Sequence, residues 1–192
     1  MTAISLSKND IDAALSRIAT GLPKYLWLQA NRDASDLRAD SAYRRRFNHF
    51  YRVRRGQEWQ DAFYGLLEEK KGKAVLFSEV LDALYRTTGR YEASFASKLL
   101  ATIDPEMPVI DSAVLRNLRL RLPAFSAKDR SARICQLHAE LLSTFHDFLA
   151  TEGGRYVVRR FRETYPDADV TAVKMLDLVL WQVRFDSAFS GP

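Results

Sequence analysis

Hydrophobic residues recur every three to four positions along most of the chain, which is the spacing of one buried face on an α-helix. Glycine, proline and capping residues separate these stretches, and no alternating strand of useful length or internal repeat interrupts them. We therefore predict an all-α fold of nine or ten short helices. The expected helices are 7–21, 24–40, 42–56, 58–72, 78–89, 92–105, 111–122, 126–154 and 169–185.

The helix ends carry specific signals. Ser7 precedes the first helix, with Asp10 three residues later as an acidic capping partner. Segment 155–166 is short, and its paired valines leave helix and strand both open. The last helix is apolar most of the way round, which predicts a buried central position. No glycine-, serine- or proline-rich linker divides residues 1–192, so we expect a single all-helical domain, either undivided or built of two lobes with a cleft near Asp111.

The overall composition excludes several classes of protein but does not by itself assign a function. The 192 residues are 47% hydrophobic, which is enough for a substantial core and excludes a disordered chain. We expect no membrane segment, since the most apolar stretch is short and carries Lys174 and Asp177, and no signal peptide, since the N-terminal residues lack a positive region followed by a long apolar run. A single cysteine excludes an intrachain disulfide, and a cytoplasmic protein is the simplest expectation. The net charge of +5 comes mostly from arginine, a residue suited to binding phosphate.

The most basic stretch is "SAYRRRFNHFYRVRR", residues 41–55, in which six arginines alternate with four aromatic residues. On one continuous helix the aromatic residues face inward, while Arg45, Arg52 and Arg55 fall near one side. Such a face can lie against the phosphates of double-stranded DNA. It can equally be a solvated surface whose arginines pair with the acids of residues 32–40, and the pattern leaves both interpretations open.

We expect neither a metal nor another cofactor. The chain has only three histidines and no pair of cysteines at ligand spacing. His138 and His146 fall on one expected helix, but eight residues separate them, which is about 12 Å along the axis and too far to share one zinc ion.

The stretch "PVIDSAVLRNLRLRLP", residues 108–123, places an acid at the start of a helix. Asp111 or Ser112 can cap that helix, and the unpaired backbone amides there favour an ionised carboxylate. Asp111 is therefore a candidate both for a structural cap and for a group that stabilises positive charge during a reaction.

This stretch resembles a signature of the helix-hairpin-helix base-excision DNA glycosylases. Their signature, "PVDTHVxRVxxRL", contains the catalytic aspartate, and Asp111 falls on it with one extra residue, Ile110, before the acid. Arg116 lies near the family's arginine, and Gly89 corresponds to the first glycine of the DNA-binding hairpin, with Arg90 and Tyr91 beside it. The segment also resembles parts of bacterial proteins of unassigned function.

Two departures change what the resemblance implies. The second hairpin glycine is replaced by Tyr91, and the lysine of the bifunctional enzymes would fall at Glu92 or Ala93. Lys98 is near, but it precedes Asp111 by 13 residues and not by the family's 18 or 19. The resemblance thus implies a monofunctional glycosylase that flips a base out of duplex DNA, hydrolyses its N-glycosidic bond with Asp111 and leaves an abasic site. Tyr91 or Trp59 would then stack against a base or act as a wedge.

Two other interpretations remain open. In one, the chain keeps the fold without the chemistry and binds DNA or protein while Asp111 acts only as a cap. In the other, it is a helical interaction module, which predicts an exposed apolar patch and a dimer.

Overall fold

A computed structural model describes residues 4–184 and confirms the all-α prediction, because every regular element in that range is a helix. The elements are α1 (Lys8–Ile18), α2 (Leu22–Asn31), α3 (Ser41–Tyr51), α4 (Gln57–Lys70), α5 (Phe77–Thr88), α6 (Ala93–Ile103), α7 (Ser112–Asn117), α8 (Arg130–Leu149), α9 (Glu152–Thr164) and α10 (Ala172–Gln182). The predicted capping box is present at α1, where the Asp10 backbone N–H donates to Ser7 Oγ and the Ser7 backbone N–H donates to the Asp10 carboxylate.

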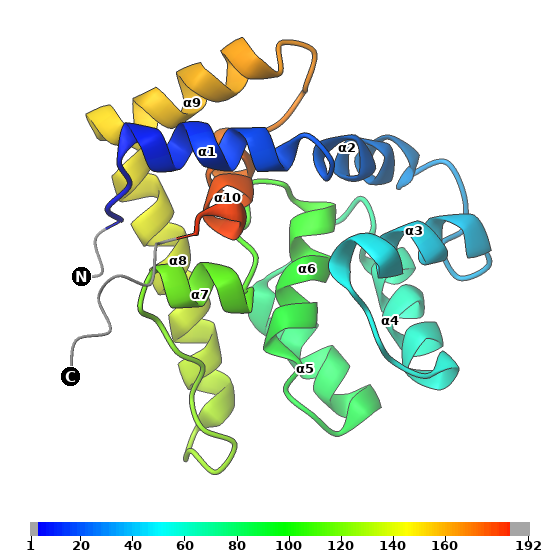
Figure 1. The fold of residues 1–192 in the computed structure, drawn as a ribbon. Coiled ribbons are helices and arrows are strands. Elements are labelled where there is room, and N and C mark those ends of the chain that lie inside the picture. The colour runs from blue at the N-terminus through cyan, green and yellow to red at the C-terminus, as the bar shows by residue number, and fades with distance from the viewer. Residues whose placement is uncertain (1–3, 185–192) are drawn as a thin grey trace.

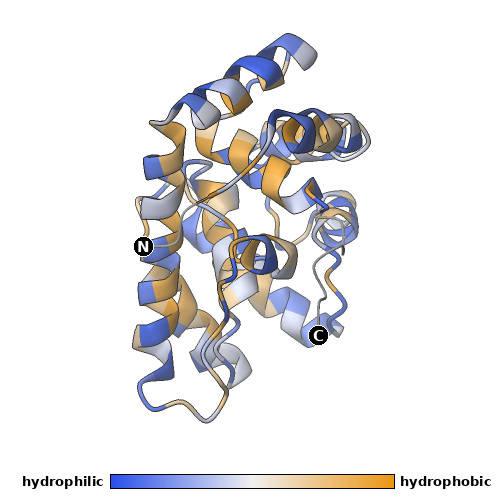
Figure 2. Ribbon diagram, turned by 60° about the vertical axis from the view of Figure 1, so that its left-hand side comes forward, coloured by the Kyte–Doolittle hydropathy of each residue, from blue (hydrophilic) through white to orange (hydrophobic). Residues whose placement is uncertain are grey.

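Helix α10 lies at the centre of the molecule. It packs against α1, α7, α8 and α9, and residues 173–180 are all buried, as its apolar sequence predicted (Figure 1). Figure 2 shows the hydrophobic positions of the surrounding helices turned toward this interior and the hydrophilic positions turned outward. The expected last residue of this helix, Phe185, lies outside the described residues.

The boundary between α8 and α9 differs from the prediction. Gly153 and Gly154 do not end the long helix but lie in the first turn of α9, whose N-cap is Thr151. The prediction was wrong because Gly154 serves close packing: a Cβ there would lie 2.2 Å from the carbonyl oxygen of Phe148. Segment 155–166, left open from its sequence, belongs mostly to α9.

Helices α2 and α3 are both shorter than expected. Helix α2 ends at Asn31, where the guanidinium of Arg32 donates to the carbonyls of Thr102 and Ile103 at 2.9 Å each and so satisfies the end of α6. Helix α3 ends at Tyr51, and Arg52 takes the left-handed conformation with φ 54°. The expected continuous helix over residues 42–56 is therefore wrong, and so is the single face that Arg45, Arg52 and Arg55 were expected to share.

Helix α7 is a single short element of six residues. It ends where Arg119 takes a positive φ of 56°, and the Asn117 side-chain amide donates to the carbonyl of Leu180 at 2.7 Å. That bond ties the end of α7 to the last turn of α10. Leu122, the last residue of the expected helix 111–122, is 39% exposed because the helix stops before reaching it.

Candidate functional site

A cavity of about 680 Å³ opens between the end of α3, the first half of α6, the start of α7 and one face of α10. Four aromatic side chains line it, namely Tyr25, Phe50, Tyr51 and Trp181. The Trp181 and Phe50 rings meet edge to face, with centroids 5.6 Å apart. Trp59 and Tyr91, the stacking residues suggested by the sequence, do not line this cavity. Trp59 is packed against Phe63 and Phe95 instead.

The irregular segment before α7 forms one side of the cavity and is held by side chains from distant parts of the chain. Each of four backbone groups in it bonds to a different side chain. These bonds join the Pro105 carbonyl to Thr171 Oγ1 (2.8 Å), the Pro108 carbonyl to His138 Nε2 (3.3 Å), the Val109 N–H to Asp177 Oδ1 (3.3 Å) and the Ile110 N–H to Ser97 Oγ (2.8 Å). Such anchoring fixes the position of the next residue, Asp111, relative to α6 and α10.

Asp111 is the N-cap of α7, as predicted. Its Oδ1 accepts a 2.8 Å hydrogen bond from the backbone N–H of Ala113, and the half-buried side chain lines the cavity. Only one carboxylate oxygen is used by the cap. The position therefore suits both of the roles considered for this acid, because an N-cap carboxylate can still face a ligand.

Lys98 is the functional candidate that sequence spacing rejected. It lies on α6, lines the cavity with Asp111 and is only 8% exposed. Within residues 4–184 its ammonium group has no hydrogen bond or ion pair. Its contacts are with ring faces, at 5.1 Å from the Phe95 centroid and 5.7 Å from the Tyr51 centroid. Burial lowers the pKa of Lys98, and the negative charges of Asp111 and Asp177 offset only part of that effect.

One signal in the sequence could have identified Lys98. It stands in the run "SKLLATI", in which no other residue is charged, and lies one turn after Ser94 on the same helix face, and both residues line the cavity. A lysine within the buried face of a helix is unusual unless it is paired or functional.

A buried ion pair forms the floor of the site on α10. The ammonium of Lys174 lies 2.7 Å from Asp177 Oδ2, and the two side chains are 2% and 8% exposed. Burial by itself lowers the pKa of Lys174, but Asp177 and Tyr25 together raise it by more, so the net shift is upward. Asp177 also receives the Val109 N–H, so this pair connects α10 to the segment that carries Asp111.

Exposed arginines lie around the cavity, and the structure brings only some of the predicted ones together. Arg52, at the end of α3, and Arg116, on α7, both line it, joined by Arg184 after α10. Arg45 is exposed on α3 and does not line the cavity. Arg55 lies 2.7 Å from Glu92 in an ion pair that ties α4's start to α6.

The expected hairpin is the turn between α5 and α6, and it too lies apart from the cavity lining. Gly89 ends α5 with a φ of 69°, a conformation that suits glycine, and Arg90 is exposed beside it. Tyr91 stacks on Tyr85, with ring centroids 4.2 Å apart. The turn thus presents a glycine, a cation and a pair of aromatic rings, but no residue of it touches the cavity.

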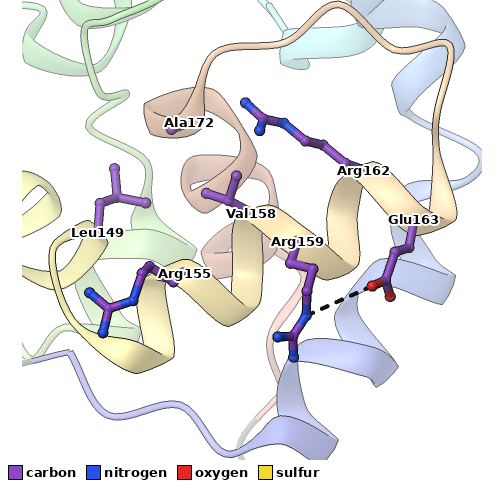
Figure 3. A pocket seen from close by; sticks show the side chains of 7 residues that line it. All are labelled: Leu149, Arg155, Val158, Arg159, Arg162, Glu163 and Ala172. Atoms are coloured by element: carbon purple, nitrogen blue, oxygen red, sulfur yellow. Dashed lines mark ion pairs between the residues drawn. The ribbon is translucent and has the colours of Figure 1, made fainter.

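A second, more open hollow of about 540 Å³ lies between the end of α8, α9 and the start of α10 (Figure 3). Arg155, Arg159 and Arg162 project from α9 around it, and its one carboxylate, Glu163, pairs with Arg159 at 3.7 Å. No buried ionisable side chain lines this hollow, so it lacks the combination found beside Asp111.

His138 anchors the site by remaining neutral. Its ring stacks on Phe77 at 4.0 Å and donates Nε2–H to the Pro108 carbonyl, and burial lowers its pKa from 6.5 to about 4.

The lowered pKa of His138 predicts that stability depends on pH. Because the unfolded chain takes up a second imidazole proton on His138 more readily than the folded chain does, stability is lost as the pH falls from about 6.5 toward 4. Between pH 7.5 and 4.5 we expect a loss of about 2 to 3 kcal/mol from this residue. Urea unfolding at both pH values measures it, and His138→Gln should reduce the pH dependence by that amount. An equal dependence in the variant would contradict the assignment.

Among residues 4–184, no group of three or more histidine, cysteine, aspartate or glutamate side chains is arranged to hold a metal ion. No helix in this range has the length and apolar character needed to cross a bilayer. Comparison of the chain with protein-family models, with curated proteins and with solved structures finds no match.

Proposed function

We propose that the cavity beside Asp111 receives a base flipped out of duplex DNA and that the protein hydrolyses the N-glycosidic bond of that base. The observation that carries this proposal is that Asp111 and Lys98 line the same cavity. Lys98 is buried and has no ion-pair partner among the described residues, and aromatic side chains and exposed arginines line the cavity as well. The resemblance of residues 108–122 to the glycosylase signature points to the same acid.

The dimensions and chemistry of the cavity suit a nucleotide. Its volume of about 680 Å³ lies within the range of small-ligand sites. The rings of Tyr51 and Trp181 can contact a planar base by stacking, as in other proteins that bind unpaired nucleotides. Arg52 and Arg116 line the cavity and can supply cations to the phosphates next to a flipped nucleotide.

The proposed role of Asp111 is electrostatic. As the bond to the base breaks, positive charge develops on the sugar, and the carboxylate stabilises that charge more than it stabilises the neutral substrate. The carboxylate oxygen not used by the cap can also orient the attacking water. The reaction leaves an abasic site and a free base.

Fluorescence anisotropy of a labelled duplex, intact or with an abasic-site analogue, tests the proposal at two salt concentrations. We expect salt-dependent binding with a clear preference for the abasic analogue, because that duplex spares the cost of extruding a paired base. Equal binding to both duplexes would indicate a DNA-binding protein without this chemistry. Absence of binding at low salt would contradict the DNA proposal altogether.

Removing one arginine beside the cavity should weaken DNA binding in a recognisable way. For Arg52→Gln we expect weaker binding to all sequences and a salt slope reduced by about 1, since one phosphate contact is lost. Arg159→Gln is the matched control, because it removes an exposed arginine from α9, which lies on the other side of α10 from α7 in Figure 1. An equal effect of both substitutions would show that the cavity does not define the DNA-binding face.

A further inference from the structure

Lys98 presents its ammonium group to the cavity, where the group remains accessible and has no hydrogen-bond acceptor among the described residues. A largely buried ammonium group is costly unless an acceptor compensates it, and Lys98 has ring faces beside it and the longer-range charges of Asp111 and Asp177, but no direct hydrogen bond or ion pair within the described residues. The other buried lysine of the site, Lys174, shows the usual solution, a carboxylate at 2.7 Å. The absence of such a partner at Lys98 indicates that its acceptor is a ligand.

The two carboxylates that line the cavity with Lys98 are bound wholly or in part by other groups. Asp177 binds Lys174 and the Val109 N–H. Asp111 uses one oxygen on the Ala113 N–H, and its other oxygen is the group proposed to face the sugar. The balance of charge is also positive, because five basic side chains and two carboxylates line the cavity.

We infer that Lys98 donates to a carbonyl oxygen of the flipped base, and that the site therefore selects deaminated or oxidised bases over alkylated bases that carry a positive charge. This inference rests on the proposed function and names its substrate class. Uracil, hypoxanthine and 8-oxoguanine are examples of the selected class, and 7-methylguanine is an example of the rejected one.

The chemistry of bond breaking strengthens this selection. Hydrolysis breaks the C1′–N bond, leaves the bonding electron pair on the base and adds the hydroxyl of water to C1′, while the water proton ends on the released base. A neutral base with carbonyl groups accumulates negative charge on its oxygens during this step. A hydrogen bond from Lys98 to that oxygen is therefore stronger in the transition state than in the bound substrate.

A cationic base is disfavoured beside Lys98, because the positive lining repels it in the bound state before reaction. It departs as a neutral molecule, so no net negative charge develops on it for the ammonium to stabilise. Aromatic walls can favour cations, but here cations already lie near two of the rings. Lys174 is 5.4 Å from the Tyr25 centroid, and Lys98 is 5.7 Å from the Tyr51 centroid.

The test is single-turnover excision from matched duplexes containing uracil, hypoxanthine, 8-oxoguanine or 7-methylguanine, with wild-type protein, Lys98→Met and Lys128→Met. Lys128→Met is the control, since it removes an exposed lysine that does not line the cavity. We expect wild-type excision of at least one of the three neutral bases and a loss of about 10- to 100-fold in Lys98→Met on that base. Lys128→Met should leave the rate unchanged.

Binding of the same duplexes provides a second test of the inferred base selectivity, and this test does not depend on turnover. The Asp111→Asn protein should bind the duplex with the preferred base more tightly than the 7-methylguanine duplex, and adding Lys98→Met should remove that difference. Faster excision of 7-methylguanine than of each of the three neutral bases would overturn the inference and leave the proposed function standing. Failure to excise or preferentially bind any of the four would overturn both.

A urea titration establishes that Lys98→Met is folded. Methionine fills a similar volume without an uncompensated charge, so the variant should unfold at an equal or higher urea concentration than the wild type. Loss of excision together with a gain of stability in Lys98→Met would indicate that Lys98 contributes to function at a cost in stability. Unchanged excision in this folded variant would contradict the assigned role.

Discussion

Asp111→Asn should slow base excision at least 100-fold while leaving the free energy of unfolding almost unchanged. Asparagine caps a helix about as well as aspartate, so its side chain can still accept the Ala113 N–H now bound at 2.8 Å. It cannot supply a negative charge opposite the positive sugar, and removing one well-placed electrostatic group typically costs about 10²- to 10³-fold in rate. Single-turnover excision from the preferred duplex, with anisotropy for binding, measures the two effects separately.

The alanine variant provides the matched control. Asp111→Ala loses both the charge and the cap, so we expect the same loss of rate together with about 0.5 to 2 kcal/mol of lost stability. Urea unfolding of the two variants separates the roles of the side chain. If Asp111→Asn excised at the wild-type rate, Asp111 would be a cap alone, and the catalytic proposal would fail.

Breaking the buried ion pair should have the largest effect on stability. Asp177→Ala leaves Lys174 charged and unpaired at 2% exposure and also removes the acceptor of the Val109 N–H. Loss of one member of such a pair costs about 3 to 5 kcal/mol, most of it the desolvation of the remaining charge. Urea unfolding of the variant, followed at constant pH, measures this loss.

A double variant shows where that cost arises. Lys174→Met with Asp177→Leu removes both charges and keeps the volume, so it should recover most of the stability lost by Asp177→Ala. It should not recover DNA excision fully, because the Val109 N–H still lacks its acceptor and Asp111 is less firmly positioned. A single variant as stable as the wild type would show that Lys174 gives up its proton or reaches water at little cost.

The helices themselves followed from local patterns. The capping box at Ser7 and Asp10, the cap at Asp111 and the burial of residues 173–180 were all predicted and observed. The errors lie at helix ends, where contacts with residues distant in the sequence decide at which residue a helix begins or ends. Helix α2 stops where Arg32 reaches the end of α6, and Gly154 lies inside α9 because Phe148 packs against it. Neither contact has a signal in the neighbouring sequence.

The candidate site was predicted only in part. Asp111, Arg52 and Arg116 line the cavity, whereas Arg45, Arg55 and the Gly89–Tyr91 turn do not. Arg55 was misplaced because residues 52–56 leave the helix, and its guanidinium meets Glu92, which is 37 residues away in sequence. The aromatic wall of the cavity was missed entirely, since it is assembled from α2, α3 and α10.

The sequence by itself determined the all-α architecture, the central helix and the acid at the start of α7, because periodicity and capping act within a few residues. Only the tertiary structure decided that Lys98 and Asp111 face one cavity. The spacing of Lys98 and Asp111 along the chain does not predict that they face one cavity, since an irregular segment lies between α6 and α7. The path of that segment is set by hydrogen bonds to Thr171, His138 and Asp177, and these partners come together only when α8 and α10 pack.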